Sequence, residues 1–220
     1  MHPPRFYNSL APFYNILRDY PYTPIRRNLT AAMNLTSGST VFDLCCGTGM
    51  NFPYLAHHIS DNGKIIAIDG SPAMLKRARK CAGKLKAQQP NLIFDFIELD
   101  LTSYAAIDTL TTIISQHQPT HFICTLGFTC LPNSQSLLKL IYDQAQPQST
   151  FALFDVHTPK KNFSARLINL IGACDAALDP ASHLASLNSH PTNRSAITTD
   201  YPFKMPPFRK IAIKSITLTK

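Results

Sequence analysis

The sequence predicts a doubly wound α/β fold built on a mostly parallel sheet. Short runs rich in β-branched residues alternate with longer amphipathic runs along the middle of the chain, which is typical of strands joined by crossover helices. Turn residues bound each of these runs. At 220 residues with 45% hydrophobic composition, the chain is long enough to bury one sizeable core, so a single domain is expected.

The expected strands are five short apolar segments, each followed by a turn signal. They span Thr40 to Leu44, Lys64 to Asp69, Leu92 to Leu99, His121 to Thr125 and Thr150 to Val156. Because parallel crossovers are right-handed, they place helices on both faces of the sheet.

Helix signals lie between these strands. One helix is predicted to begin near Asn51. Another begins at Ser71, an N-cap residue that is followed by the first-turn proline Pro72, with apolar residues repeating on one face from Met74 onward. A final strand is expected within Arg209 to Lys220.

Two regions depart from this alternation. Met1 to Thr30 concentrates aromatic residues beside prolines, and we expect a short aromatic helix that covers a cleft. Lys160 to Asp200 holds a candidate amphipathic helix from Phe163 to Leu178, followed by a stretch rich in Pro, Ser and Asn. Irregular stretches of that length are often lids or mobile segments.

The charge of the chain is strongly basic, with 21 Lys and Arg against 13 Asp and Glu. The excess is concentrated in Lys76 to Lys86 and Tyr201 to Lys220, which contain no acid. Anionic lipid, RNA or a phosphorylated metabolite would each suit this pattern. A solvated basic surface is the simpler interpretation and the one we favour. The net positive charge therefore favours acidic partners but identifies none of them.

The six cysteines show no CxxC pair and no Cys/His spacing typical of a metal site, so no metal is predicted and a reduced compartment is expected. The first residues lack the apolar core of a secretion signal, and no stretch approaches twenty consecutive apolar residues. We therefore expect a cytoplasmic protein.

The strongest local motif is VFDLCCGTGMNF, an apolar strand whose end carries Asp43 and which is followed by Gly47 and Gly49 in a turn. Glycine allows positive φ and lets the backbone pass close to a ligand, while a carboxylate accepts hydrogen bonds from a cationic or amide-bearing neighbour. The carboxyl end of a strand is also where open α/β sheets bind ligands. The motif therefore predicts a ligand-binding loop.

A second motif, IIAIDGSPAML, ends the next strand at Asp69, 20 residues after Gly49. A carboxylate there can accept hydrogen bonds from both hydroxyls of a ribose. The two motifs together indicate a cofactor that carries a nucleoside.

The glycine pattern separates two classes of cofactor. A dinucleotide loop has the pattern GxGxxG, which seats a pyrophosphate at a helix N-terminus. Here the three positions are Cys45, Gly47 and Met50, and the acid Asp43 would repel a pyrophosphate. A sulfonium ligand with a ribose and an amino-acid tail fits better, and a nicotinamide-dependent oxidoreductase is the alternative.

DLCCGTG resembles the first motif of the class I S-adenosylmethionine-dependent methyltransferases, commonly an acid followed by x-G-x-G-x-G. IIAIDGSPAML resembles the family's ribose-binding segment and FIELDL its third motif, which implies that Asp100, with Leu101, lies at the adenine edge. Cys45 stands where the family usually has its first loop glycine. The resemblance implies an S-adenosylmethionine cofactor and a Rossmann-like sheet of about seven strands, the last one antiparallel.

FYNSLAPFYN and ICTLGFTCLPN resemble the small-molecule and lipid branch of this family, related to the ubiquinone-type and phospholipid N-methyltransferases. The resemblance implies a helical lid (1–30), a cofactor-binding core (31–156) and an acceptor-side insertion with the final strands (157–220). It makes Tyr7 and Tyr14 candidates for contact with the cofactor or acceptor, although helix packing explains them equally well. The resemblance also implies that the cofactor lies over Thr125, Leu126 and Gly127. An ordinary turn by which the chain leaves the strand explains these three residues equally well.

The predicted reaction is direct methyl transfer to a small-molecule or lipid-like acceptor, with possible contact to an anionic membrane. Such a transfer needs alignment and sometimes a base, for which His157 and Tyr14 are the candidates, although a lone histidine is more often structural. A protein that binds the cofactor without methylating remains a third hypothesis. The absence of a DPPY or NPPY run makes nucleic acid an unlikely partner, and Cys124 and Cys130 are interpreted as buried thiols.

The complete predicted cofactor site comprises Tyr7, Tyr14, Asp43, Leu44, Cys45, Gly47, Thr48, Gly49, Asn51, Asp69, Gly70, Ser71, Met74, Asp100, Leu101, Thr125, Leu126 and Gly127. The acceptor atom and the oligomeric state are left open by the sequence.

Overall fold

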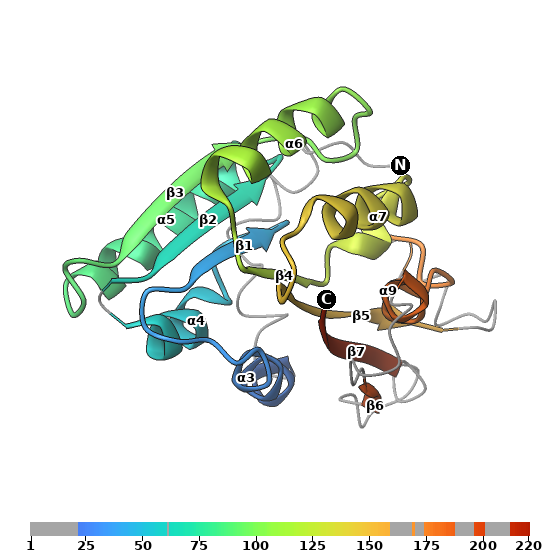
Figure 1. Ribbon diagram of the computed structural model, residues 1–220, viewed down its shortest axis with the longest axis horizontal. Coiled ribbons are helices and arrows are strands. Elements are labelled where there is room, and N and C mark those ends of the chain that lie inside the picture. The colour runs from blue at the N-terminus through green and yellow to red at the C-terminus, as the bar shows by residue number, and fades with distance from the viewer. Residues whose placement is uncertain (1–21, 61, 159–168, 170–173, 188–195, 201–211) are drawn as a thin grey trace.

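A computed structural model describes residues 22–60, 62–158, 169, 174–187, 196–200 and 212–220. Within these residues a seven-stranded sheet in the order β3-β2-β1-β4-β5-β7-β6 separates two layers of helices (Figure 1). The strands are β1 (Thr40–Leu44), β2 (Lys64–Asp69), β3 (Ile93–Glu98), β4 (His121–Thr125), β5 (Thr150–His157), β6 (Ala196–Asp200) and β7 (Ala212–Thr219).

The helices are α3 (Thr23–Ala31), α4 (Phe52–Ile59), α5 (Pro72–Lys86), α6 (Ala106–His117), α7 (Ser134–Gln144) and α9 (Pro180–Leu187), with the short 3-10 helix η2 at Phe128–Cys130. Strands β1 to β5 are mutually parallel, and β7 is antiparallel to both of its neighbours, β5 and β6. The predicted doubly wound, mostly parallel fold is confirmed.

Strand alternation builds a separate core on each face of the sheet. In β1, Val41 packs with α3, α4 and α5 on one face, whereas Phe42 packs with α6, α7 and α9 on the other. Both side chains have no exposed surface. Because β1 is covered on both faces, its residues from Val41 to Leu44 are all buried instead of alternating between core and solvent.

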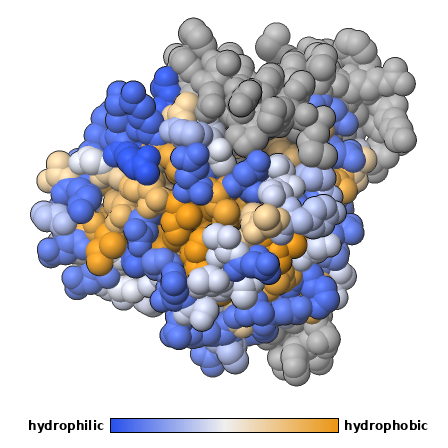
Figure 2. Space-filling view, turned by 90° about the horizontal axis from the view of Figure 1, so that it is seen from above, coloured by the Kyte–Doolittle hydropathy of each residue, from blue (hydrophilic) through white to orange (hydrophobic). Residues whose placement is uncertain are grey.

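The surface of the molecule is mixed in character. Seen from above, hydrophobic residues gather toward the middle of one face, and hydrophilic residues dominate its border (Figure 2). Among the described residues, none of the helices combines the length and the apolarity needed to cross a membrane.

Local sequence signals position the start of α5. The Ser71 hydroxyl accepts a hydrogen bond from the Met74 backbone N–H at 3.2 Å, and Pro72 opens the first turn. The predicted N-cap is therefore confirmed. It fixes the helix directly behind the end of β2.

The carboxyl-terminal region differs from the sequence expectation. Of the helix expected at Phe163 to Leu178, residue 169 is helical, residues 174–178 are not, and the others lie outside the described residues. The helix found there, α9, begins at Pro180 because the Asp179 carboxylate accepts hydrogen bonds from the Ser182 N–H at 3.1 Å and hydroxyl at 2.8 Å. Strand β6 lies where an irregular stretch was expected and pairs with β7 at the sheet edge.

Candidate functional site

The loop between β1 and α4 presents an open backbone at Gly47. This residue has φ +56°, and a Cβ added to it would meet no atom of the described residues within 4 Å. Its N–H donates to Asp69 Oδ2 at 2.8 Å. The positive φ predicted for this glycine is present, and its contact with a ligand stays a prediction.

The next glycine of the loop, Gly49, is required for packing. Gly49 has φ +83°, and an added Cβ would lie 2.6 Å from the Phe52 ring. Glycine is required here so that Phe52, which has no exposed surface, can pack beneath the loop. Gly47 thus borders open space, whereas Gly49 allows the loop to pack onto α4.

Asp69 joins the loop to the start of α5. Its second carboxylate oxygen, Oδ1, accepts from the Ser71 N–H at 2.9 Å. Burial raises the pKa of Asp69, the hydrogen bonds from Ser71 and Gly47 lower it, and the negative charge of Asp100 raises it. Each oxygen keeps a free lone pair that can accept a further hydrogen bond.

Asp100 lies at the end of the neighbouring strand. Its Oδ1 accepts from the Thr102 N–H at 3.0 Å and the Thr102 hydroxyl at 2.6 Å, which shapes the loop after β3. The following residue, Leu101, is buried. The carboxyl ends of β2 and β3 therefore bring two acids and an apolar side chain to the same edge of the sheet.

Asp43 lies deeper, with no exposed surface. Its Oδ1 accepts from Asn51 Nδ2 at 2.8 Å, while Oδ2 has no hydrogen-bond partner within the described structure. Burial raises the pKa of Asp43 to about 7, opposed by the Asn51 hydrogen bond and the positive charge of Arg26. A buried carboxyl with an unfilled oxygen is unusual in a site that serves only packing.

Arg26 was not identified from the sequence. From α3 its guanidinium donates to Asn51 Oδ1 at 2.5 Å and to Thr125 Oγ1 at 2.6 Å. It also lies 5.3 Å from the centre of the Phe154 ring. The result is a buried network at the ends of β1 and β4, in which Arg26 and Asp43 carry opposite charges around Asn51.

Cys45, at the position of the missing loop glycine, adopts a glycine-like backbone with φ +54°. Its side chain occupies space that Gly127 leaves empty, because a Cβ added to Gly127 would lie 2.5 Å from Cys45 Cβ. Leu126 also has a positive φ, +59°. Strained backbone of this kind is concentrated at functional sites in proteins, and here it lies on two facing loops.

The structure thus brings together the predicted Asp43, Cys45, Gly47, Asn51, Asp69, Asp100, Thr125 and Gly127. Leu44, Thr48 and Met74 are buried, with 2% of each exposed, and support the loops from within the core. Tyr7 and Tyr14 lie outside the described residues.

His157 ends β5 beside the carboxyl-terminal segment. Its Nδ1 is 3.0 Å from the Leu178 carbonyl oxygen, an arrangement in which Nδ1 carries the proton and donates. Nε2 lies 3.8 Å from Asp179, which also pairs with Lys214 of β7. Whether His157 acts as a base stays a prediction.

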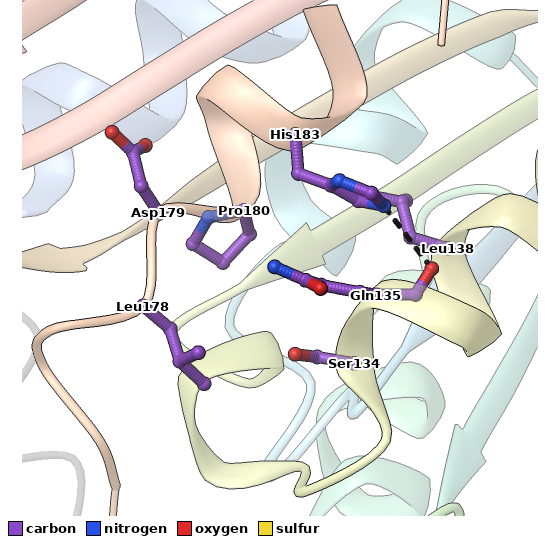
Figure 3. A pocket seen from close by; sticks show the side chains of 7 residues that line it. All are labelled: Ser134, Gln135, Leu138, Leu178, Asp179, Pro180 and His183. Carbon is purple, nitrogen blue, oxygen red and sulfur yellow. Dashed lines mark hydrogen bonds between the residues drawn. The ribbon is translucent and has the colours of Figure 1, made fainter. Parts of the chain in front are cut away.

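Two hollows lie away from these loops. A shallow pocket between the starts of α7 and α9 is bordered by Ser134 and Asp179, and His183 Nε2 lies 3.2 Å from the Gln135 carbonyl oxygen (Figure 3). A groove of about 530 Å³ between α3 and the β6–β7 pair includes Thr219, which pairs with the first residue of β5. Among the described residues, neither hollow is bordered by a member of the predicted cofactor site.

Comparison with known proteins identifies the family and the fold. Residues 35–190 match the family model described as a methyltransferase domain. A carboxy-S-adenosyl-L-methionine synthase from Escherichia coli is 34% identical over 119 residues, which cover 53% of this chain and 43% of that protein. The chain thus spans less than half the length of this curated relative.

Solved structures share the fold at low sequence identity. A SAM-dependent methyltransferase from Aquifex aeolicus aligns over 100% of both chains with a TM-score of 0.56 and 15% identity. A geranyl diphosphate C-methyltransferase from Streptomyces coelicolor aligns over 90% of this chain and 75% of its own, with a TM-score of 0.64 and 9% identity. The chain belongs to the methyltransferase domain family, and its fold is that of the class I S-adenosylmethionine-dependent methyltransferases.

Proposed function

We propose that the chain binds S-adenosylmethionine at the carboxyl ends of β1, β2 and β4 and transfers its methyl group to a small-molecule acceptor. The observation that carries this proposal is the joining of Gly47 to Asp69 beside open space at the Gly47 backbone. When bound, the cofactor supplies an electrophilic methyl group on a sulfonium. The protein has to orient the two reactants and exclude water.

Asp69 is the proposed ribose partner. Backbone N–H groups hold both of its oxygens, so the carboxylate is fixed before a ligand arrives. Its remaining lone pairs suit the two hydroxyls of a ribose. Asp100 and Leu101 at the neighbouring strand end are the proposed partners of the adenine.

The buried network is the proposed partner of the methionine end. An amino-acid group carries an ammonium and a carboxylate, and the network holds an acid, Asp43, and a guanidinium, Arg26, joined through Asn51. Binding of an ammonium favours the ionised form of Asp43, whose pKa is about 7 without a ligand. Neither Asp43 nor Arg26 needs a phosphate as its binding partner, which argues against a nicotinamide dinucleotide.

Proton removal depends on the acceptor. For acceptors that lose a proton, we propose His157 as the base, since the contact of Nδ1 with the Leu178 carbonyl leaves Nε2 as the basic nitrogen. Tyr14, a lipid-like acceptor and contact with an anionic membrane remain proposals from the sequence. Small acceptors are further supported by the geranyl diphosphate enzyme among the structural neighbours.

A second candidate function is synthesis of a carboxylated S-adenosylmethionine. The 34% identity to a carboxy-S-adenosyl-L-methionine synthase over 119 residues favours it. The same cofactor site would serve this reaction, because the adenosyl and methionyl groups are unchanged.

One experiment separates the two candidates. Purified protein is incubated with S-adenosylmethionine and a pool of small metabolites, and nucleoside products are followed by mass spectrometry. Methyl transfer releases S-adenosylhomocysteine, whereas the second reaction yields S-adenosylmethionine heavier by one carboxyl group. Appearance of neither product, with no binding of S-adenosylhomocysteine, would contradict both.

A further inference from the structure

Two thiols meet at the cofactor loop. Cys124, near the end of β4, lies beside the cofactor loop, because its partner in β1 is Leu44, the residue before Cys45. A hydrogen bond between the two thiols contributes to the pKa of both. Both sulfurs border the space left by the missing side chain of Gly127, at 2.9 and 3.0 Å from where its Cβ would be. Neither cysteine forms a disulfide. The proposed methyl transfer uses neither of these groups.

We propose that Cys45 and Cys124 form a reversible oxidation site for hydroperoxides, in which a disulfide crosslinks the cofactor loop to the end of β4. The Cys45 thiolate attacks a peroxide oxygen, giving a sulfenic acid and releasing hydroxide or an alcohol. The Cys124 sulfur then displaces the sulfenic oxygen, which leaves as water. Overall, two thiols lose two hydrogens and two electrons, and the peroxide is reduced.

Exposure and hydrogen bonding assign the two roles. Cys45 is partly exposed, whereas Cys124 is 2% exposed, so a solvent oxidant reaches Cys45 first. The hydrogen bond from Cys124 lowers the pKa of Cys45, although burial and nearby negative charges leave it raised overall. Burial raises the pKa of Cys124 well above its ordinary value. Cys45 is therefore the better thiolate, and Cys124 resolves the sulfenic acid.

We expect the crosslink to weaken cofactor binding, an expectation that rests on the proposed function. Cys45 lies two residues from Gly47, whose N–H joins the loop to Asp69. A bond to Cys124 pulls Cys45 toward β4 and restrains a loop that already holds Cys45 at φ +54°. We expect the disulfide to weaken S-adenosylhomocysteine binding by about 5-fold or more. A bound cofactor should in turn shield Cys45 from oxidation.

Peptide mapping tests the crosslink itself. The reduced full-length protein is treated with hydrogen peroxide, capped with N-ethylmaleimide, cleaved with trypsin and examined by mass spectrometry. We expect a disulfide between Asn28 to Lys64 and Ala87 to Lys139 that dithiothreitol reverses. Because these peptides also contain Cys46 and Cys130, the variants Cys46→Ala and Cys130→Ala serve as matched controls and should keep the crosslink.

Loss of the crosslink in Cys45→Gly and Cys124→Ala is the expected result, together with protection of the wild type by S-adenosylhomocysteine. Cys45→Gly suits the positive φ, so it removes the thiol without new backbone strain. A crosslink that survives in either variant, or over-oxidation of Cys45 without any crosslink, would overturn the site. Failure of the protein to bind S-adenosylhomocysteine would contradict the proposed function and leave the mapping result to decide the oxidation site.

Discussion

The backbone N–H of Gly47 donates to the Asp69 carboxylate over 2.8 Å, which joins the loop after β1 to the end of β2. The same carboxylate accepts from the Ser71 N–H at the start of α5. One acid therefore fixes two loops that approach a ligand from different strands. Substitution of Asp69 should damage both the loop geometry and any ribose contact.

Asp69→Ala is expected to weaken S-adenosylhomocysteine binding by about 10- to 100-fold, since hydrogen bonds to a charged group contribute about 1.5 to 3 kcal/mol each. Isothermal titration measures the change. Asp108→Ala, which removes an exposed carboxylate on α6, is the matched control and should bind as the wild type does. An unchanged dissociation constant for Asp69→Ala would place the ribose elsewhere.

Cofactor affinity should depend on the protonation of Asp43. Its pKa of about 7 means that the carboxyl is neutral below pH 7 in the free protein, whereas a ligand ammonium favours the ionised form. S-adenosylhomocysteine affinity should therefore fall below pH 7, approaching about tenfold per pH unit. Asp43→Asn should flatten this dependence. A wild-type affinity that is constant between pH 5 and pH 8 would contradict the role of Asp43.

The same group links stability to pH in the free protein. Because the folded-state pKa of Asp43 is raised from 3.8 to about 7, the folded state binds the extra proton, and that stabilisation is lost as pH rises through about 7. Asp43→Asn should therefore increase the melting temperature at pH 8, and the gain should shrink toward pH 4. Differential scanning calorimetry across this range would reveal the opposite trend if Asp43 were stabilised as a carboxylate.

Arg26→Met is expected to disrupt the network. It removes the Arg26 donor from the Thr125 hydroxyl oxygen and leaves Asn51 Oδ1 with only the Thr125 hydroxyl as donor. It also removes the positive charge that lowers the pKa of Asp43. Leaving a buried acceptor without its donor costs about 1 to 3 kcal/mol. The pH midpoint of cofactor binding should also move upward, a shift that a purely packing role would not produce. Arg26→Lys keeps the charge and should move the midpoint less.

The fit between Cys45 and Gly127 predicts a non-additive pair of variants. Gly127→Ala places a Cβ 2.5 Å from Cys45 Cβ, and overpacking of this kind costs about 1 to 3 kcal/mol. Removing the Cys45 side chain in the double variant should relieve part of that cost, and urea denaturation measures it. Gly83→Ala in α5, which meets no atom within 4 Å, is the control and should be neutral or stabilising.

Local chemistry explains which parts of the fold were predictable. The bounds of β1, β2 and β4 match the expectation, because continuous apolar runs ended by turn residues are local signals. The third strand is shorter by one residue at each end, and the fifth is longer by one. The edge strand β6 depends on pairing with β7, and α9 depends on the Asp179 cap, so neither is encoded in hydrophobic periodicity.

The candidate site likewise contains residues that local motifs predict and one residue that they do not. Asp43, Gly47 and Asp69 belong to local motifs and were predicted, whereas Arg26 acts through contacts to Asn51 and Thr125, 25 and 99 residues away. The available signal was its spacing of three residues from Leu29 on the buried side of α3. A charged residue at a buried helical position is a reason to search for a partner.

The central claim is that the Gly47–Asp69 edge binds S-adenosylmethionine rather than a dinucleotide. Parallel isothermal titrations of the wild-type protein with S-adenosylhomocysteine and with NADH test it directly. Saturable binding of S-adenosylhomocysteine, weakened by about 10- to 100-fold in Asp69→Ala, with no heat from NADH, is the predicted result. Binding of NADH without S-adenosylhomocysteine would contradict it.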